Sequence, residues 1–333
     1  MTDIWALSDL CTPWCVHVVA TLRVAHHIEA GHRLIGDLAA AAGADRDALH
    51  RVLRHLIEKG VFEEPAPGSF ALNDAARPLL DEGMLVGFDL EGFGGRMAHA
   101  WNSLLTAVRT GRPAYHEIFG RPFWDDLQAH PAIAERFDAL MGPLGHGVPD
   151  PEVLLSGDWT AIRHVVDVGG GTGTLLAEVL RVHPAVRGTL VDQAATVARA
   201  GRTFQEAGVA DRATWTAQSF FDPLPAGADL YLLKSVLCDW PDPEAIAILA
   251  RCAEAARPNG RVVLVNDVSP DREGGPAPEL LMLVLVGGRG RSLAEFRPLA
   301  RQAGLEVVAA GRQRSGRFTV ECAPSGAVTQ SGT

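Results

Sequence analysis

The sequence predicts an α/β protein, in which a mostly helical N-terminal domain precedes a Rossmann-like domain with a mostly parallel sheet. After about residue 155, short apolar stretches alternate with helical stretches, the pattern of a parallel sheet with helices on both faces. The first hundred residues instead show helix, helix, helix and hairpin, the order of a winged helix. Between these regions, residues 142–151 are rich in Gly and Pro. We therefore expect domains at 1–150 and 151–323, and a fraying polar tail at 324–333.

The winged-helix prediction depends most on the third helix. Its apolar residues follow helical spacing, Asp45 before it is a suitable N-cap, and Gly60 after it is a suitable C-cap. The hairpin follows directly, around a Pro/Gly turn at residues 65–68. In full, we expect helices over residues 14–24, 34–42, 46–59, 91–109 and 122–141, and hairpin strands at 61–64 and 69–72.

The charge of the chain argues against a nucleic-acid partner, although winged helices often bind DNA. The formal net charge is −10, and residues 1–100 alone carry 14 Asp and Glu against 8 Lys and Arg. No uncharged apolar run reaches the roughly 18 residues of a membrane span, and no basic stretch with an apolar run opens the chain. We expect a cytoplasmic protein that binds neither nucleic acid nor membrane.

The five cysteines predict no metal site. They form no CxxC pair and no Cys/His cluster with zinc spacing. Cys11 and Cys15 are four residues apart, so they are expected to share one face of a helix. The interpretation favoured here is buried thiols in a reducing compartment.

The second domain is predicted strand by strand. A helix is expected over residues 243–256, and an antiparallel hairpin at 305–309 and 317–321 is expected to close one sheet edge. The remaining strands are expected at 164–168, 188–191, 213–217, 230–233 and 261–265.

A glycine-rich turn after the first of these strands predicts a nucleotide-type cofactor site. Such a turn into a helix presents free backbone N–H groups and lets a ligand approach the backbone closely. Asp167 stands just before Gly169, Gly171 and Gly173, and Asp192 ends the next strand, where it could hold the hydroxyls of a ribose. Thr174 replaces the third glycine of a dinucleotide fingerprint, so the spacing favours S-adenosylmethionine (SAM) over NAD. A tight turn without a ligand is the alternative.

These residues belong to a longer set of motifs that resembles one family, the SAM-dependent O-methyltransferases of small aromatic natural products, of the plant and actinomycete type. The resemblance implies a class I SAM methyltransferase fold, a winged-helix dimerisation domain, a homodimer formed through the N-terminal helices, a small aromatic substrate, S-adenosylhomocysteine as product, and no metal. The matching motifs are Thr12-Pro13, residues 22–25, 109–114, Phe123-Trp124, 167–173, 220–225, 237–240, Gly287-Gly288 and 303–305.

The resemblance also implies roles for residues around the cofactor. Asp167, Gly169 and Gly171 would line the amino-acid tail of SAM, and Asp192 would hold its ribose. Ser219 and Phe220 would flank the adenine, although many relatives have Asp at the position of Ser219. Lys234 would lie near the methionine carboxylate of SAM and Trp240 near the adenine.

The catalytic positions depart from the family. Many relatives carry a histidine base before the Asp-Trp pair, where this chain has Cys238, and two supporting glutamates, where it has Asn266 and Gly290. One explanation is a methylation that needs little base assistance, in which alignment of the acceptor supplies the rate. A second is a different base, and the candidates are Cys238, Asp239, Asp267, His99, His116 and His146.

A third explanation is an enzyme that keeps SAM without transferring its methyl group, as a hydroxylase, decarboxylase or pericyclase. The bound sulfonium would then stabilise negative charge that develops on the substrate. A non-catalytic binding protein is the remaining class. We expect O-methylation by proximity, with the SAM-retaining enzyme as the alternative.

The substrate pocket is expected between the two domains, with apolar walls that suit a planar acceptor. For Phe123 and Trp124, packing in the core is an equally good interpretation. The expected wall residues are Trp101, Phe123, Trp124, Met141, His146, Leu237, Met282 and Val286.

Overall fold

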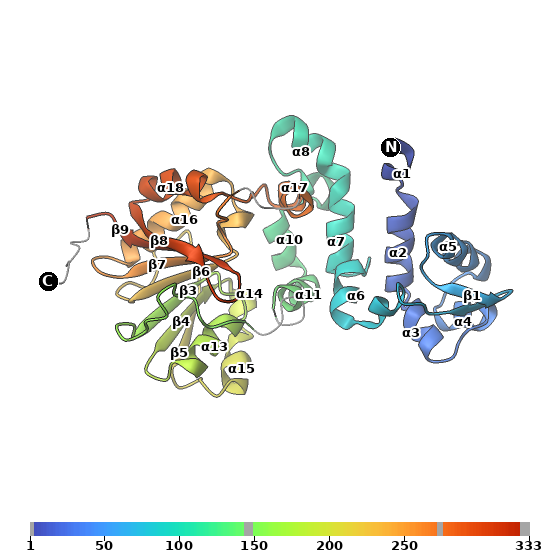
Figure 1. Cartoon of the computed structure of the whole chain (residues 1–333), viewed down its shortest axis with the longest axis horizontal. Helices are drawn as coiled ribbons and strands as arrows, with labels where there is room; N and C mark the ends of the chain where they lie inside the picture. The colour runs from blue at the N-terminus through green and yellow to red at the C-terminus, as the bar shows by residue number, and fades with distance from the viewer. Residues whose placement is uncertain (1–2, 143–148, 272–275, 327–333) are drawn as a thin grey trace. The chain divides into compact units, whose positions relative to one another are not determined.

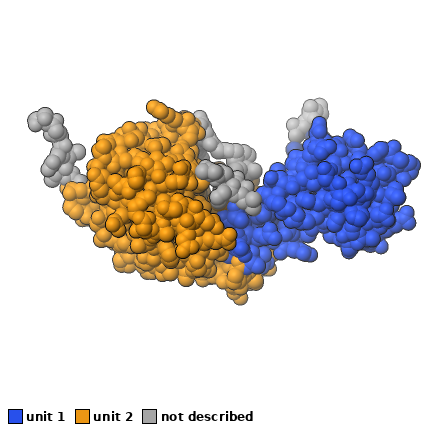
Figure 2. Space-filling view, turned by 90° about the horizontal axis from the view of Figure 1, so that it is seen from below, with its two compact units in different colours: residues 1–99, 132–140 blue, residues 100–131, 141–333 orange. Residues whose placement is uncertain are grey.

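A computed structural model describes residues 3–142, 149–271 and 276–326. The chain divides into two compact units, coloured separately in Figure 2. The first comprises residues 1–99 with 132–140, and the second comprises residues 100–131 with 141–333. The helical segment 100–131 therefore belongs to the same compact unit as the sheet, a partition that differs from the boundary expected at residue 150.

In the first unit, the three predicted helices and the hairpin occur in the predicted order, and two further short helices, Ile4–Leu7 and Val24–Glu29, also precede the hairpin. Asp45 caps the third helix by accepting a hydrogen bond from the backbone N–H of Ala48, and Gly60 follows that helix with a φ of +81°. The hairpin strands are antiparallel, with Glu63 opposite Ala71. The elements are α1 (Ile4–Leu7), α2 (Cys11–Thr21), α3 (Val24–Glu29), α4 (Ile35–Ala41), α5 (Arg46–Glu58), β1 (Glu63–Ala66), β2 (Ser69–Ala71), η1 (Arg77–Leu80), α6 (Glu82–Phe88), α7 (Phe93–Ala100) and α11 (Pro131–Met141).

Three of the predicted helices are interrupted, and each break has a local cause. The helix expected over 14–24 ends at Thr21, because Arg23 adopts a left-handed φ of +50° while its guanidinium donates two hydrogen bonds to Glu82. The helix expected over 91–109 breaks at residues 101–103, where the Ser103 hydroxyl bonds the Ala100 carbonyl. The helix expected over 122–141 breaks before Pro131, since a residue that precedes proline is disfavoured in helical geometry.

The second unit contains a seven-stranded sheet in the order β5-β4-β3-β6-β7-β9-β8 (Figure 1). The first five strands in that order are parallel, and β8 and β9 form the expected antiparallel hairpin at one edge. The strands are β3 (His164–Val168), β4 (Arg187–Asp192), β5 (Ala213–Ala217), β6 (Leu230–Lys234), β7 (Arg261–Val265), β8 (Leu305–Arg312) and β9 (Phe318–Pro324). The helices are η2 (Trp101–Ser103), α8 (Leu104–Thr110), α9 (Tyr115–Phe119), α10 (Phe123–Ala129), α13 (Thr174–Val182), α14 (Ala194–Val197), α15 (Ala200–Glu206), η3 (Leu237–Asp239), α16 (Asp242–Ala255), α17 (Pro276–Leu285) and α18 (Leu293–Gln302).

The strand predictions agree closely with this sheet. β3, β5 and β7 have the predicted bounds, and β4 and β6 extend the predicted ranges by one residue at one or both ends. The hairpin strands are longer than expected, and β9 continues to Pro324, into the segment expected to fray. No described helix is long and apolar enough to cross a membrane.

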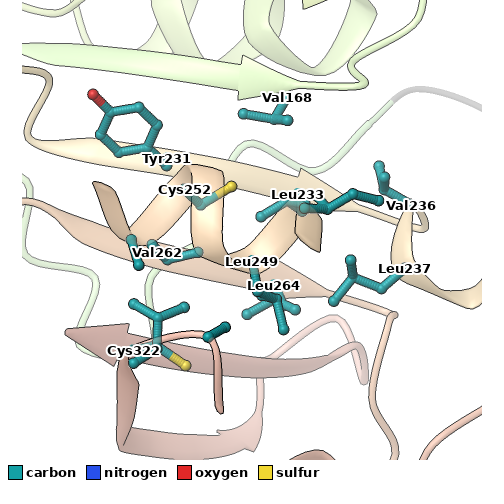
Figure 3. Close-up of a cluster of buried hydrophobic side chains, with 14 of the residues drawn as sticks. Val168, Tyr231, Leu233, Val236, Leu237, Leu249, Cys252, Val262, Leu264 and Cys322 are labelled. Atoms are coloured by element: carbon teal, nitrogen blue, oxygen red, sulfur yellow. The ribbon is translucent and has the colours of Figure 1, made fainter. Parts of the chain in front are cut away.

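Two apolar layers hold the sheet between helices. α16 and α18 cover one face, and α13 and α15 cover the other (Figure 1). Figure 3 shows the first layer, where Leu233 of β6 and Leu264 of β7 pack with Leu249 and Cys252 of α16. Residues of the central strands β3, β4, β6 and β7 enter both layers, so burying these strands on both faces fixes their register and the positions where they end.

Candidate active site

The candidate site lies at the carboxyl ends of the parallel strands. After β3 the chain continues to β4 and β5 on one side, and it later places β6 and β7 on the other side. Such a reversal of strand order leaves a crevice at the ends of the central strands, where open α/β sheets bind their ligands. The glycine turn follows β3 and the Cys238 segment follows β6, so both predicted parts of the site flank this crevice.

The glycine turn has the backbone shape that a close ligand requires. Gly169, Gly171 and Gly173 all have left-handed φ values, of +68°, +64° and +83°. A side chain at Gly170 would collide with the Asp167 carboxylate, whereas one at Gly171 would meet nothing within 4 Å. The turn is therefore packed tightly on its inner side and open at Gly171.

Two carboxylates stand beside this turn and have different partners. Asp192 accepts hydrogen bonds from the backbone N–H groups of Gly171 (2.8 Å) and Gln193 (2.7 Å), so it holds the turn in place. Asp167 is 1% exposed, and no hydrogen-bond partner for its Oδ2 is found among the described residues. A buried carboxylate oxygen without a donor is costly, so Asp167 is prepared for a donor that a ligand would bring.

Electrostatics reinforce the difference between these two acids. Burial, followed by the nearby Asp192 carboxylate, raises the pKa of Asp167 to about 7, while the Lys234 ammonium opposes this shift. Burial also raises the pKa of Asp192, against the two N–H groups that it accepts. A cationic group placed beside Asp167 would favour its ionised form.

An aromatic cluster stands next to the turn. The Phe220 and Trp240 rings meet edge to face at 5.8 Å, and Phe221 meets Trp240 at 4.9 Å. Trp240 is also stacked on Trp124 of α10, with centroids 6.1 Å apart. A side chain at Gly169 would lie 3.4 Å from Phe220, so Phe220 borders the turn itself. Ser219 is exposed, and its hydroxyl accepts a hydrogen bond from the Phe221 N–H.

The segment after β6 is shaped by Asp267, one of the predicted catalytic residues. Asp267 is 3% exposed, and its Oδ1 accepts hydrogen bonds from the backbone N–H groups of Leu237 (2.6 Å) and Cys238 (3.3 Å). Burial raises its pKa to about 6, although these N–H groups oppose the shift. Ser235 and Asn266, which follow β6 and β7, both adopt left-handed φ values, of +55° and +61°. Backbone strain of this kind gathers at functional sites.

Cys238 occupies the position of the family's base and Asp239 follows it, and both are half-buried. Burial raises the pKa of the Cys238 thiol well above its usual range, and the Asp239 carboxylate adds to this effect. Cys238 is therefore a neutral thiol at pH 7 and a poor base. Burial and the Asp267 carboxylate raise the pKa of Asp239 to about 7, close to the value that suits a general base.

The Gly287-Gly288 motif and Arg291 contact the backbone of residues 237–240 and hold it in place. A side chain at Gly288 would collide with the Cys238 carbonyl, so only glycine allows this contact. The Arg291 guanidinium is buried and donates to the carbonyls of Leu237 (2.8 Å) and Trp240 (2.7 Å) and to Asp242 (2.9 Å). The backbone around Cys238 is thus held from both ends.

One carboxylate near this segment was missed by the sequence analysis. A side chain at Gly290, where relatives carry a glutamate, would begin 3.2 Å from Oε1 of Glu279. Glu279 comes from α17, so a carboxylate from another element lies next to the position left by the absent one. A motif comparison made position by position cannot find such a neighbour.

The predicted pocket residues have different environments. Trp101 and Met141 are 39% and 43% exposed, Met282 and Val286 are half-buried, and all four belong to the second unit. Phe123 is 4% exposed and packs between Tyr115 and Trp124, which favours core packing.

The three histidine candidates for the base also differ in their environments. His116 is exposed on α9. His99 packs on Trp14, and both belong to the first unit. His146 lies outside the described residues.

The sheet order, the glycine turn and the acid that ends β4 define a Rossmann-like enzyme that binds a nucleoside cofactor. A model of the O-methyltransferase domain matches residues 101–306. The chain belongs to this family of SAM-dependent methyltransferases.

Individual relatives cover nearly the whole chain. The chain is 44% identical over 309 residues to 2,7-dihydroxy-5-methyl-1-naphthoate 7-O-methyltransferase of Streptomyces carzinostaticus. This match covers 92% of this chain and 92% of the relative. It is 39% identical over 331 residues to aclacinomycin 10-hydroxylase RdmB of Streptomyces purpurascens, covering 94% of this chain and 86% of the relative. A similar crystal structure is that of NcsB1, an O-methyltransferase from neocarzinostatin biosynthesis, in complex with SAM and 2-hydroxy-5-methyl naphthoic acid. It has a TM-score of 0.91 and 42% identity, and the match covers 97% of this chain and 99% of NcsB1.

Proposed function

We propose that this enzyme transfers the methyl group of SAM to a hydroxyl of a small aromatic or polyketide-like natural-product intermediate, without a histidine base. The observation that carries the proposal is the buried Asp167 carboxylate beside the open Gly171 turn. The similarity to a naphthoate O-methyltransferase, and to a structure with SAM and a naphthoic acid, supports the acceptor class.

The residues at the turn fit SAM. The cofactor carries an ammonium group, which would supply the donor that Asp167 Oδ2 lacks, and the space at Gly171 admits a ligand against the backbone. The Asp192 oxygens accept hydrogen bonds from the Gly171 and Gln193 N–H groups, and they could also accept hydrogen bonds from the ribose hydroxyls. Lys234 would lie near the methionine carboxylate, and Phe220 would border the adenine.

The protein's task in this reaction is alignment. When bound, SAM supplies a methyl group that its sulfonium already activates. The chain must hold the acceptor oxygen in line with that methyl group and exclude water, and the braced backbone at residues 237–240 suits this purpose. A rigid support of this kind is what an enzyme that works by proximity needs.

The proton of the acceptor needs no histidine if the acceptor is acidic. A phenol of lowered pKa, or a carboxylate, would arrive ionised. Cys238 is a neutral thiol at pH 7, so it would act as a wall of the pocket. Asp239 is the nearest ionisable alternative, with a pKa of about 7.

The proposal is tested by incubating the purified protein with SAM and a hydroxynaphthoic acid, and by measuring S-adenosylhomocysteine and methylated product together. Equal amounts of the two are expected. The matched control is Asp167→Asn, which should form neither. Consumption of the acceptor without S-adenosylhomocysteine would overturn the proposal.

The same assay tests a second function, a SAM-retaining enzyme that does not methylate. The specific observation in its favour is the 39% identity to a protein named as a hydroxylase, over 94% of this chain. The replacement of the family's base by Cys238 is compatible with it. An oxidised product with SAM left intact would establish this function.

The homodimer is also proposed. The first helix exposes large apolar side chains, with Trp5 82% and Ile4 71% exposed, and a dimer contact would cover them. Trp5→Glu should shift the molar mass measured by light scattering from dimer to monomer, whereas Val308→Glu, at another exposed apolar residue, should not. A wild-type monomer at micromolar concentration would refute the dimer.

A further inference from the structure

Three side chains in the first unit form a cluster that the SAM site does not use. The Cys11 and Cys15 sulfurs are 3.8 Å apart, and they and a ring nitrogen of His55 all lie within 4.8 Å of one another. Cys11 is exposed, Cys15 is 8% exposed, and His55 is half-buried. The cluster is thus accessible from one side and enclosed on the other.

The chain holds these groups in place through the start of α2. The Asp9 carboxylate accepts the backbone N–H groups of Cys11 (2.8 Å) and Thr12 (3.2 Å), which fixes the first turn of the helix. One turn later, Cys15 projects from the same face as Cys11. The Thr12 hydroxyl donates to Asp9 and lies 2.8 Å from His55 Nε2, so His55 of α5 is held over this turn.

The spacing of the sulfurs matches a tetrahedral metal site. Zinc–sulfur bonds of about 2.3 Å at tetrahedral angles place two sulfurs about 3.8 Å apart. This is the observed distance between the Cys11 and Cys15 sulfurs. We propose that Cys11, Cys15 and His55 bind a zinc ion, which would link the first turn of α2 to α5 within the first unit.

Zinc binding at this site requires the two thiols to lose their protons. Cys11 and Cys15 are free thiols, with no disulfide between them. Binding of Zn²⁺ would displace one proton from each thiol, and the two thiolates would neutralise the charge of the ion. These three side chains leave the fourth position of the ion to water. A three-ligand site of this kind exchanges its metal more readily than a closed four-ligand site.

The test uses cobalt as a spectroscopic probe for the zinc site in the full-length protein, reduced and freed of metal. Co²⁺ bound by thiolates gives intense charge-transfer absorption in the near ultraviolet. One Co²⁺ per chain is expected to produce this absorption, and Zn²⁺ should abolish it by displacement. Cys11→Ser, Cys15→Ser and His55→Gln should each weaken Co²⁺ binding at least tenfold.

The controls separate a true site from general thiol chemistry. His50→Gln changes another histidine of α5, and Cys252→Ala removes a buried thiol of the second unit, so both should bind Co²⁺ as the wild type does. A melting curve for each variant shows whether it is folded, and Zn²⁺ should raise the wild-type melting temperature but not that of Cys15→Ser. The proposal is overturned if stoichiometric Co²⁺ gives no charge-transfer absorption, or if Cys15→Ser retains it. A Cys11–Cys15 disulfide that persists under reductant would also overturn it.

Discussion

The site has two ends that resemble each other: the first end is the glycine turn after β3, and the second end is the Cys238 segment after β6. At each end, one acid accepts hydrogen bonds from two backbone N–H groups. Asp192 does so with both of its oxygens at the glycine turn, and Asp267 does so with Oδ1 alone at the Cys238 segment. At each end, the neighbouring acid has a pKa of about 7, Asp167 at the first and Asp239 at the second.

The difference between the ends lies in what the second acid faces. Asp167 is buried and lacks a donor for Oδ2, whereas Asp239 is half-buried beside a neutral thiol, with its Oδ1 3.9 Å from the Cys238 sulfur. The first end is therefore poised for a cationic ligand, and the second end has a braced backbone in which Asp239 is the ionisable group beside the neutral thiol. The site is specified more strongly for binding SAM than for deprotonating an acceptor.

The largest effect is expected from breaking the first end. Asp167→Asn should weaken SAM binding about 100-fold or more, because a buried charged partner of an ammonium group contributes about 2–5 kcal/mol. Titration calorimetry with SAM measures the change. Asp158→Asn, the same substitution at an exposed acid before β3, is the matched control and should bind normally. Affinity within threefold of wild type for Asp167→Asn would show that the carboxylate does not hold the cofactor.

Removing the Asp267 carboxylate, which holds the Cys238 segment, should lower the free energy of unfolding. Asp267→Ala leaves the buried N–H groups of Leu237 and Cys238 without their acceptor, so unfolding free energy should fall by about 2 kcal/mol. Denaturant titration measures it, with Asp211→Ala on an exposed loop as control. If the two variants are equally stable, Asp267 does not brace the segment.

The pH dependence of SAM binding sharpens the role of Asp167. The pKa of this acid is raised to about 7 in the free protein, so it is protonated below pH 7 and ionised above it. A cationic ligand binds the ionised form, so affinity should fall about tenfold from pH 8 to pH 6. Calorimetry at a series of pH values tests this. Affinity that is constant over the range, or that rises toward low pH, contradicts the assignment.

The smallest effect is expected from Asp239. If alignment supplies the rate, Asp239→Asn should lower kcat less than tenfold and leave the acidic limb of its pH profile in place. Glu279→Gln is the companion variant, because that carboxylate lies next to the position where relatives have a glutamate. A loss above 100-fold for Asp239→Asn, together with loss of the acidic limb, would instead identify Asp239 as a general base.

The sheet could be predicted from the sequence because its signals are local. An apolar run such as Val262–Val265, bounded by Arg261 and Asn266, fixes a buried strand with little help from distant contacts. The same holds for the glycine turn, where conformation follows from residue type. The helix breaks at Arg23 and Ser103 depend on particular hydrogen bonds, so periodicity alone missed them. Pro131 was a visible signal that the apolar pattern obscured.

The parts of the molecule that depend on distant neighbours were not predicted. His55 joins Cys11 and Cys15 only because α5 packs beside α2, and Glu279 meets Gly290 only because α17 folds back toward it. Likewise, the thiol pKa of Cys238 is raised by burial, which the sequence does not display. Residue identity therefore indicated the cofactor, while the chemistry of the acceptor depends on environment.

The stacked pair of Trp124 and Trp240 gives the enzyme an intrinsic optical signal. Two indole rings with centroids 6.1 Å apart and planes 16° from parallel couple their electronic transitions, which produces a paired band in circular dichroism. One ring belongs to α10 and the other to the segment that follows Cys238, so any shift between these elements changes the coupling. The molecule thus carries its own reporter of movement at the site, readable in solution without a label.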